Sequence, residues 1–320
     1  MRKMILRMHA YFYAMNDKVP GTLRHKNFVM WVVCNTMVRV CRVLLLCHAS
    51  VCRMLGMYPQ PLSGEGDVVV SFTSFPKRIG SVWLVVDSMM RQDVPPAQVQ
   101  LYLSEEEFPE GRSSLPKRLL KYTELGLDIR FRPDNLMPHN KYFYALQENK
   151  DKLVVTVDDD LYYYPNTISN LLKMHEQHPD CVCSNTMKII RYEGGSVLPY
   201  ARWERPIEQV PVSKLNIALG FNGALYPTAL FEHADRMFDK EAIRELSLKA
   251  DDLWLKALET VYGIDVTNGD YSPSSVSIVG SQAVSLMSTN TGENAQNDVQ
   301  WARLEERYGL REKLGVDKVN

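Results

Sequence analysis

From residue 67 onward, short apolar runs alternate along the chain with segments whose apolar residues recur at helical spacing. The apolar runs predict strands at 67–74, 98–104, 127–132, 153–157 and 181–187. Helical spacing predicts helices at 79–92, 115–125, 139–149, 166–178, 251–262 and 298–314. Strands and helices that alternate in this way are typical of βαβ units. We therefore predict an α/β fold with a mostly parallel sheet flanked by helices.

A different pattern precedes residue 66. Residues 27–56 are largely apolar with helical spacing, but Arg39 and Arg42 fall mid-segment, so the longest uncharged run is shorter than the about 20 residues that a membrane span needs. One narrow stripe of the helix contains Asn35, Arg39, Arg42, Ala49, Ser50 and Arg53. We interpret the segment as a basic amphipathic helix in peripheral contact with an anionic membrane. The alternative is a helix packed on the rest of the protein with its arginines in water.

Prolines, glycines and a serine between residues 59 and 66 indicate a linker. We therefore divide the chain into a helical extension with its linker, residues 1–65, and a larger domain with a C-terminal helix, residues 66–320.

Charge and cysteines separate the same two parts. The hydrophobic content of 45% and charged content of 23% are those of an ordinary globular protein, and the net charge is −1. Yet residues 1–60 contain nine Lys or Arg and one acid, which predicts an appendage with its own partner. Four of the six cysteines also lie there, without zinc spacing, so we expect reduced thiols in the cytoplasm. We expect no nucleic-acid partner.

Three consecutive carboxylates, Asp158, Asp159 and Asp160, follow the apolar run at 153–157. On an extended chain Asp158 and Asp160 point to one side, roughly 6–7 Å apart, a spacing that suits Mg²⁺ or Mn²⁺ beside phosphates. Ligands of open α/β sheets bind at this end of the strands. The alternative is an acidic loop before the next helix. Tyr163 and Ser169 stand where a calcium loop needs Gly and Glu, and Tyr162 argues against a haloacid-type phosphatase.

Two further segments offer groups for a nucleotide. Thr73 and Ser74 leave the first predicted strand and are suited to hydrogen bonds with a base or ribose, while Lys77 and Arg78 supply charge for a diphosphate. Lys141 lies near the start of a predicted helix, where an anion is favoured. A polar turn and a solvated lysine are the alternative interpretations.

Asp251 and Asp252 open the predicted helix at 251–262. Aspartates at a helix start stabilise the helix through its dipole, by roughly 0.3–2 kcal/mol, so a structural role is one interpretation. The other is a carboxylate that takes a proton from a hydroxyl. Upstream, Gly220 and Gly223 flank a segment where backbone can approach a ligand, or they form a plain turn.

Five segments in this order resemble bacterial glycosyltransferases of the GT-A fold, family-2-like, of the capsule and surface-polysaccharide type. They read VVVSFTSFPKRI, YLSEEEFP, VTVDDDLYYYP, GFNGALYP and ADDLWL. The resemblance covers about residues 66–310. It implies a GT-A-like, Rossmann-like domain with the helical extension outside it. Asp251 stands where typical members have Glu, and their Gln-x-x-Arg-Trp element is not evident.

The resemblance also implies roles for these residues. Asp252 with Asp251 would be catalytic, and Asp160 with Asp158 would bind metal. Nucleotide-sugar binding would fall to Thr73, Ser74, Lys77, Arg78, Asp134, Lys141, Asp158 and Asp159. Acceptor binding would fall to Gly220, Asn222, Gly223 and Trp254.

The resulting prediction is a metal-dependent, inverting glycosyltransferase that uses Mn²⁺ or Mg²⁺. It moves a sugar from a nucleotide sugar, with a UDP-sugar favoured, to a saccharide or lipid-linked acceptor in surface polysaccharide synthesis. It would act in the cytoplasm, peripheral to the inner face of the plasma membrane. The alternatives are a nucleotidyltransferase, against which the lack of a Gly-rich phosphate loop counts, and a non-catalytic membrane-associated module that binds a saccharide or nucleotide.

Overall fold

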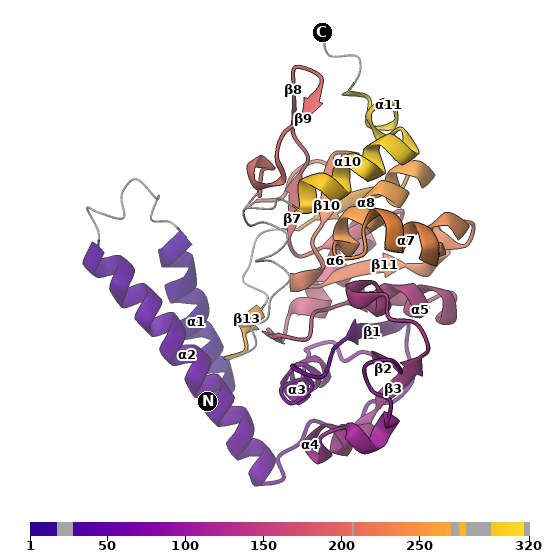
Figure 1. Ribbon diagram of the computed structural model, residues 1–320. Coiled ribbons are helices and arrows are strands. Elements are labelled where there is room, and N and C mark those ends of the chain that lie inside the picture. The colour runs from indigo at the N-terminus through magenta and orange to yellow at the C-terminus, as the bar shows by residue number, and fades with distance from the viewer. Residues whose placement is uncertain (18–27, 207, 270–274, 280–295, 317–320) are drawn as a thin grey trace.

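The apolar runs form the centre of the molecule. The computed structural model describes residues 1–17, 28–206, 208–269, 275–279 and 296–316. Within them, a seven-stranded sheet has the order β12-β6-β11-β4-β1-β2-β3 (Figure 1). Its strands are β1 Val68–Thr73, β2 Gln98–Ser104, β3 Leu127–Arg132, β4 Leu153–Thr156, β6 Cys181–Ser184, β11 Ala224–Pro227 and β12 Asp265–Asn268.

All strand pairs in this sheet are parallel except those of β11, which runs antiparallel to β4 and β6. Helices cover both faces, so the predicted α/β fold with a mostly parallel sheet is confirmed. One face packs against α3 Trp83–Met90, α4 Lys117–Leu120 and α6 Thr167–Gln177. The other packs against α5 Asn140–Glu148, α7 Lys240–Leu246, α8 Asp251–Tyr262, α10 Gln296–Tyr308 and α11 Leu310–Leu314.

Several predicted boundaries change. The helix expected at 298–314 is two helices, because Gly309 adopts a left-handed φ of 60° between α10 and α11. The strand expected at 181–187 ends at Ser184. The chain then forms β7 Met187–Ile189, which pairs with β10 Asn216–Ala218.

The remaining elements are short. Two further strand pairs are β5 Leu161–Tyr163 with β13 Ser275–Ser277, and β8 Tyr192–Glu193 with β9 Ser196–Val197. The 3-10 turns are η2 Gly111–Ser114, η3 Lys121–Leu125, η4 Met137–His139, η5 Tyr200–Arg202, η6 Gly220–Asn222, η7 Thr228–Phe231 and η8 Asp235–Phe238.

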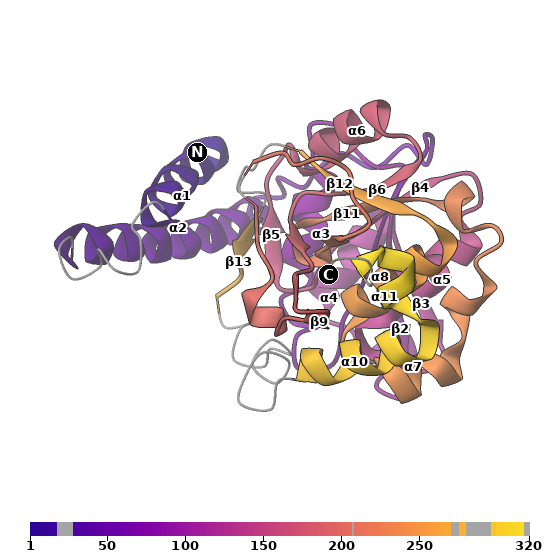
Figure 2. The same cartoon turned by 90° about the horizontal axis from the view of Figure 1, so that it is seen from above.

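The N-terminal region is a helical hairpin beside the domain, formed by α1 Arg2–Asp17 and α2 Phe28–Met54 (Figures 1 and 2). One face of α2 is buried, through Cys34, Val38, Cys41, Leu45 and Ala49. The hairpin contacts the segment after the three aspartates, since His9 Nδ1 lies 2.8 Å from the Tyr164 hydroxyl and the same hydroxyl donates to the Leu6 carbonyl. The linker follows α2 and leads into β1.

Arg39 of α2 is exposed, as predicted, but Arg42 and Arg53 do not face lipid or water. Arg53 lies over the Trp83 ring, 5.4 Å from its centroid, and Arg42 lines a small cavity with Leu84 and Tyr162. Both turn toward the domain. The outward face of α2 is instead apolar. With 27 residues and a mean hydropathy of 1.7 in its most apolar window, α2 is long and apolar enough to cross a membrane, although the sequence indicated otherwise.

Candidate active site

The three aspartates lie just past β4, at the carboxyl end of the sheet. Because β1 is parallel to β4 and adjacent to it, the segment after β1 reaches the same place. The Ser74 hydroxyl donates to Asp159, 2.5 Å away, and Arg78 donates to Asp159 at 2.6 Å. Arg78 also lies 3.2 Å from Asp160. Ser74 and Arg78, both predicted for the nucleotide, therefore lie beside the predicted metal ligands.

Burial and neighbouring charge set the protonation of these acids. Burial, together with the charges of Asp158 and Asp159, raises the pKa of Asp160 to about 7, although Arg78 opposes the rise. Burial likewise raises the pKa of Asp159, with Arg78 and Ser74 acting against it. The three aspartates therefore carry more negative charge than the single positive charge of Arg78 compensates.

Lys141, the second residue of α5, lies between the two acidic clusters. Its Nζ atom is 2.8 Å from Asp158 Oδ1 and 2.8 Å from Asp251 Oδ2. The two carboxylate oxygens are therefore no more than twice that distance apart. Burial alone would lower the pKa of Lys141. The negative charges of Asp158 and Asp251 outweigh this effect, so the pKa lies well above its usual value. The segment after β4 and the start of α8 consequently face one another.

At the start of α8 the two aspartates differ in protonation. Burial raises the pKa of Asp251, but the charge of Lys141, with a smaller contribution from His139, outweighs it, so the net shift is downward. Burial and the charge of Asp251 raise the pKa of Asp252 to about 8. Asp252 Oδ1 accepts a hydrogen bond from the Gly220 N–H at 3.1 Å. This places Gly220 beside the predicted base.

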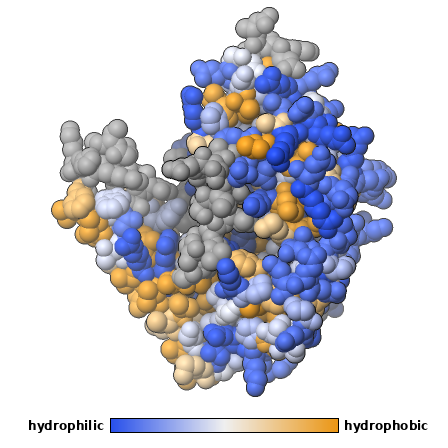
Figure 3. All heavy atoms as spheres, viewed as in Figure 1, coloured by the Kyte–Doolittle hydropathy of each residue, from blue (hydrophilic) through white to orange (hydrophobic). Residues whose placement is uncertain are grey.

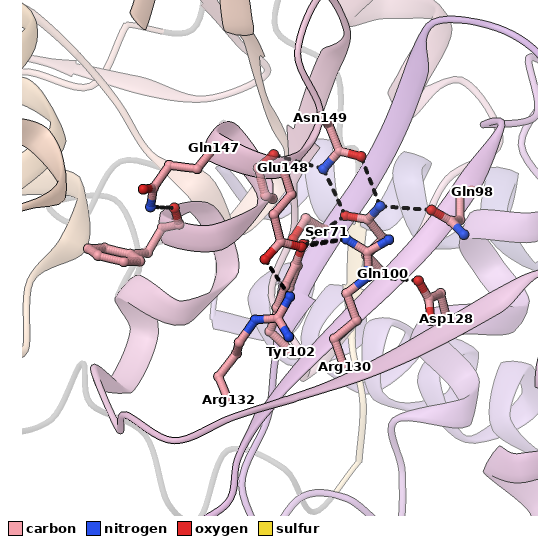
Figure 4. A network of polar contacts seen from close by, with 12 residues as sticks. Ser71, Gln98, Gln100, Tyr102, Asp128, Arg130, Arg132, Gln147, Glu148 and Asn149 are labelled. Atoms are coloured by element: carbon pink, nitrogen blue, oxygen red, sulfur yellow. Dashed lines mark hydrogen bonds and ion pairs between the residues drawn. The ribbon is translucent and has the colours of Figure 1, made fainter. Parts of the chain in front are cut away.

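A polar network anchors α5 and hence Lys141. Figure 4 shows Glu148, at the end of α5, accepting hydrogen bonds from Arg130 at 2.6 Å and from Arg132 of β3. The Tyr102 hydroxyl of β2 donates to Glu148 at 3.0 Å. At the other end of α5 the Ser71 hydroxyl donates to the Lys141 carbonyl at 2.6 Å. Both ends of the helix are thereby tied to the sheet.

Other predicted residues lie farther from the aspartates. Asp134 follows β3, two strands away from β1, and pairs with Lys240 and with Arg244 at 3.1 Å. The hydrogen bond from Lys240 lowers the pKa of Asp134. The Thr73 hydroxyl donates to the Tyr102 carbonyl, and Lys77 is exposed.

The structure brings only some of the residues predicted to bind the sugar acceptor close to the aspartates. Trp254 was predicted to bind acceptor, but it has no exposed surface and its Nε1–H donates to the Met237 carbonyl in the core, so that prediction is wrong. Asn222 donates to Thr186 and accepts from Ser275. Gly223 has a φ of 95°, which favours glycine, and a Cβ there would meet Thr167 rather than the aspartates. Gly220 alone of this group touches Lys141 and Asp252.

Sequence reasoning missed Tyr163. Its hydroxyl accepts from the Asp158 N–H at 2.8 Å and donates to the Phe221 carbonyl at 2.7 Å. It therefore joins the aspartates to the Gly220–Asn222 turn. Nothing in the run of three tyrosines distinguishes it, because the partner lies 58 residues away.

Part of the domain is similar to a known protein family. Residues 113–247, less than half of the chain, match the family model described as glycosyl transferase family 2. The matched residues include Lys141 and the three aspartates, whereas Asp251 and Asp252 lie just past the end of the match. The predicted enzyme class, a glycosyltransferase, is confirmed.

The chain is also similar to solved structures. S. aureus TarS, residues 1–349, is 16% identical with a TM-score of 0.46, over 80% of this chain and 76% of that one. The same TarS fragment in complex with UDP-GlcNAc is 15% identical with a TM-score of 0.43 over the same shares. The mannosyltransferase PcManGT from Pyrobaculum calidifontis, in complex with GDP-Man and Mn²⁺, is 14% identical with a TM-score of 0.41, over 84% of this chain and 79% of that one. No curated protein matches the chain.

Proposed function

We propose that the protein transfers a sugar from a nucleotide sugar, with a UDP-sugar favoured, to a hydroxyl of a saccharide or lipid-linked acceptor in surface polysaccharide synthesis. The observation that carries the proposal is the ammonium of Lys141, 2.8 Å from both Asp158 and Asp251. The ammonium lies between two acidic clusters and brings them close together. One cluster is suited to a diphosphate with its metal, and the other to the hydroxyl that attacks.

Asp252 is the proposed general base. A base works best when its pKa lies near the working pH, and the pKa of about 8 meets this condition. The hydrogen bond from the Gly220 N–H fixes one carboxylate oxygen, Oδ1, so the position of the carboxylate is defined. With a single base opposite the leaving group, transfer proceeds by one displacement and inverts the anomeric carbon.

Asp158 and Asp160 are the proposed ligands of Mn²⁺ or Mg²⁺. Within the described ranges no group of three or more His, Cys, Asp or Glu residues is placed to hold a metal. Such ions, however, are commonly bound through one or two carboxylates, substrate phosphates and water, which two aspartates satisfy. The raised pKa of Asp160 supports the fit, because a cation would relieve the crowded charge. When bound, the ion would stabilise the charge that develops on the leaving diphosphate, by several kcal/mol.

Donor binding is proposed for the groups around these aspartates. Ser74 and Arg78 orient Asp159, so Arg78 also brings positive charge to the diphosphate position. Thr73, Lys77 and Asp134 are proposed for the nucleoside and phosphates from the ends of β1 and β3. On the acceptor side we propose the turn at Gly220, with Asn222 and Gly223 shaping its backbone.

The cellular location is proposed to be the cytoplasmic face of the membrane. The hairpin of α1 and α2 supports this through its exposed apolar residues. Among the described residues, all but three of the exposed large apolar side chains lie between Met1 and Met57, the exceptions being Val94, Val279 and Val299. Figure 3 shows this apolar surface over the hairpin. Such a surface is typical of contact with a membrane or another protein.

Metal-dependent nucleotide binding tests the proposal directly. A thermal-shift screen of nucleoside diphosphates with and without Mn²⁺ should show stabilisation by UDP only when Mn²⁺ is present. In calorimetry, Asp160→Ala should then weaken the binding of UDP with Mn²⁺ at least tenfold. Its fold should persist, since Arg78 keeps its contact with Asp159. Asp235→Ala, at an exposed aspartate that has no proposed role in the site, is the control.

Two outcomes would contradict the proposal. Unchanged binding in Asp160→Ala would remove that residue from the metal site. Binding of UDP without any transfer or slow hydrolysis of a UDP-sugar would favour a non-catalytic binding module.

A further inference from the structure

Lys141 is held by three parts of the fold. Its ammonium contacts Asp158 after β4 and Asp251 at the start of α8, each at 2.8 Å, and its carbonyl accepts the Ser71 hydroxyl of β1. The side chain exposes only 6% of its surface. Gly220 closes a further side, because a Cβ built there would lie 3.1 Å from Nζ. The ammonium is therefore enclosed by carboxylates and backbone.

We propose that Lys141 is a positioning residue that fixes the separation between the diphosphate site and the general base. This inference rests on the proposed function and replaces the nucleotide-sugar-binding role that the sequence resemblance implied for Lys141. As a donor ligand, Lys141 would need N–H groups free to reach a phosphate. In the structure one N–H donates to Asp158, the ammonium forms a second ion pair with Asp251, and Gly220 lies against it.

The physical reason lies in the charges that the ammonium separates. Without it, Asp158 and Asp251 would be like charges in a buried space, and they would move apart or take up a proton. Asp252 would move with α8, away from the hydroxyl it activates. Small displacements of a catalytic group reduce the rate strongly, whereas the groups that bind nucleotide around Asp159 and Arg78 keep their own contacts.

The test separates positioning from donor binding. Lys141→Met should lower kcat for transfer at least 100-fold, while KM for the donor and the calorimetric Kd of UDP with Mn²⁺ change less than threefold. Lys152→Met is the matched control, because Lys152 forms an exposed ion pair with Asp67 at the opposite end of β4, and its kcat should be unchanged. A Kd weakened tenfold or more with kcat within threefold would overturn the proposal and restore Lys141 as a donor ligand.

A second variant keeps the charge and displaces it. In Gly220→Ala the new Cβ would lie 3.1 Å from Lys141 Nζ, so the ammonium must shift by a few tenths of an ångström, and it would touch Asp252 Oδ1 at 3.4 Å. Gly220 does not adopt a left-handed φ, so alanine should be tolerated by the backbone. We expect kcat to fall at least tenfold with nucleotide binding unchanged. Normal kcat in this variant would also count against the proposal.

A third measurement needs no activity. In urea unfolding, Lys141→Met and Asp251→Asn should not be additive, because each removes one partner of the same buried pair. The double variant should be less destabilised than the sum of the two. Additive effects would show that the ammonium does not bridge the clusters. Failure of the proposed function would appear differently, as a wild-type protein without transfer whose double-variant cycle is still non-additive.

Discussion

The protonation of Asp252 is the residue-scale property with the most direct consequence for activity. Burial and the neighbouring Asp251 raise its pKa to about 8, while Lys141 keeps Asp251 ionised. At neutral pH Asp251 and Asp252 therefore carry one proton, and this proton resides on Asp252. A carboxylate in that state becomes a base only as the pH rises.

We expect kcat/KM for transfer to rise tenfold per pH unit below about 8 and to level off above it, because only ionised Asp252 can accept the acceptor's proton. Steady-state rates from pH 5.5 to 9.5 with saturating Mn²⁺ provide the measurement. A rate that is flat between pH 6 and 9 would exclude Asp252 as the titrating base.

Asp252→Asn provides the control for this pH dependence. The amide retains the shape and the contact with Gly220 but cannot accept a proton, so the rate should fall by about 10²–10⁴-fold. Binding of UDP with Mn²⁺ should stay within threefold. Asp180→Asn, on an exposed surface, should leave both unchanged. Near-normal turnover in Asp252→Asn would assign the proton transfer to another group.

How far the sequence predicts these residues depends on whether their role is local. The three aspartates stand out because they follow a buried strand directly, and Asp251 with Asp252 stand out because they open a helix. Lys141 was visible as a cation, but its partners lie 17 and 110 positions away, so its bridging contacts follow only from the tertiary fold. The acceptor role of Trp254 came only from the family resemblance, and Trp254 lies two residues past the acidic pair. The turn of α8 directs it into the core instead.

At the scale of elements, α5 determines where Lys141 lies. Its start is tied to β1 through Ser71, and its end to β2 and β3 through Glu148. The sequence predicted the strands that have dense apolar runs, such as β4. The sequence did not predict β11 and β12, because strands this short contain too few residues to show the alternation of apolar and polar positions.

Glu148→Gln tests the anchor of α5. The substitution retains the shape but removes the charge that pairs with Arg130 and Arg132, so we expect a loss of about 1–2 kcal/mol in the free energy of unfolding. Urea unfolding provides the measurement. Glu241→Gln, which breaks an exposed pair with Arg244, should cost less than about 0.5 kcal/mol. Equal effects would indicate that the contacts of Glu148 stabilise the fold no more than an exposed ion pair does.

At the scale of the whole molecule, the hairpin and the catalytic domain meet at the segment after the three aspartates. His9 and Leu6 contact Tyr164, and Arg42 lies beside Tyr162. Two of the arginines interpreted as lipid contacts, Arg42 and Arg53, are used in this packing, which the sequence could not reveal because their partners Tyr162 and Trp83 lie far along the chain. What remains outward is an apolar face of α2, which includes Val40, Val43 and Val51.

The outward face of α2 makes the proposed membrane contact testable. If it inserts among lipids, two glutamates on it should weaken binding, because each places a charge where an apolar group entered the bilayer. Val40→Glu with Val51→Glu should lower cosedimentation with phosphatidylglycerol–phosphatidylethanolamine vesicles at least tenfold. Val94→Glu with Val299→Glu is the matched control, since these valines are similarly exposed on the catalytic domain. Its binding should equal that of the wild type.

Salt and oligomeric state distinguish the remaining explanations. Apolar insertion should survive 0.5 M NaCl, whereas attraction of the N-terminal cations to anionic lipid should be screened. If the Val40→Glu, Val51→Glu protein binds vesicles as the wild type does and loses binding in salt, the basic residues make the contact. If instead light scattering shows a wild-type dimer that these glutamates convert to a monomer, the face joins two copies of the chain. Reduced vesicle binding that resists salt, with the protein monomeric in both forms, would establish the apolar face of α2 as the membrane contact.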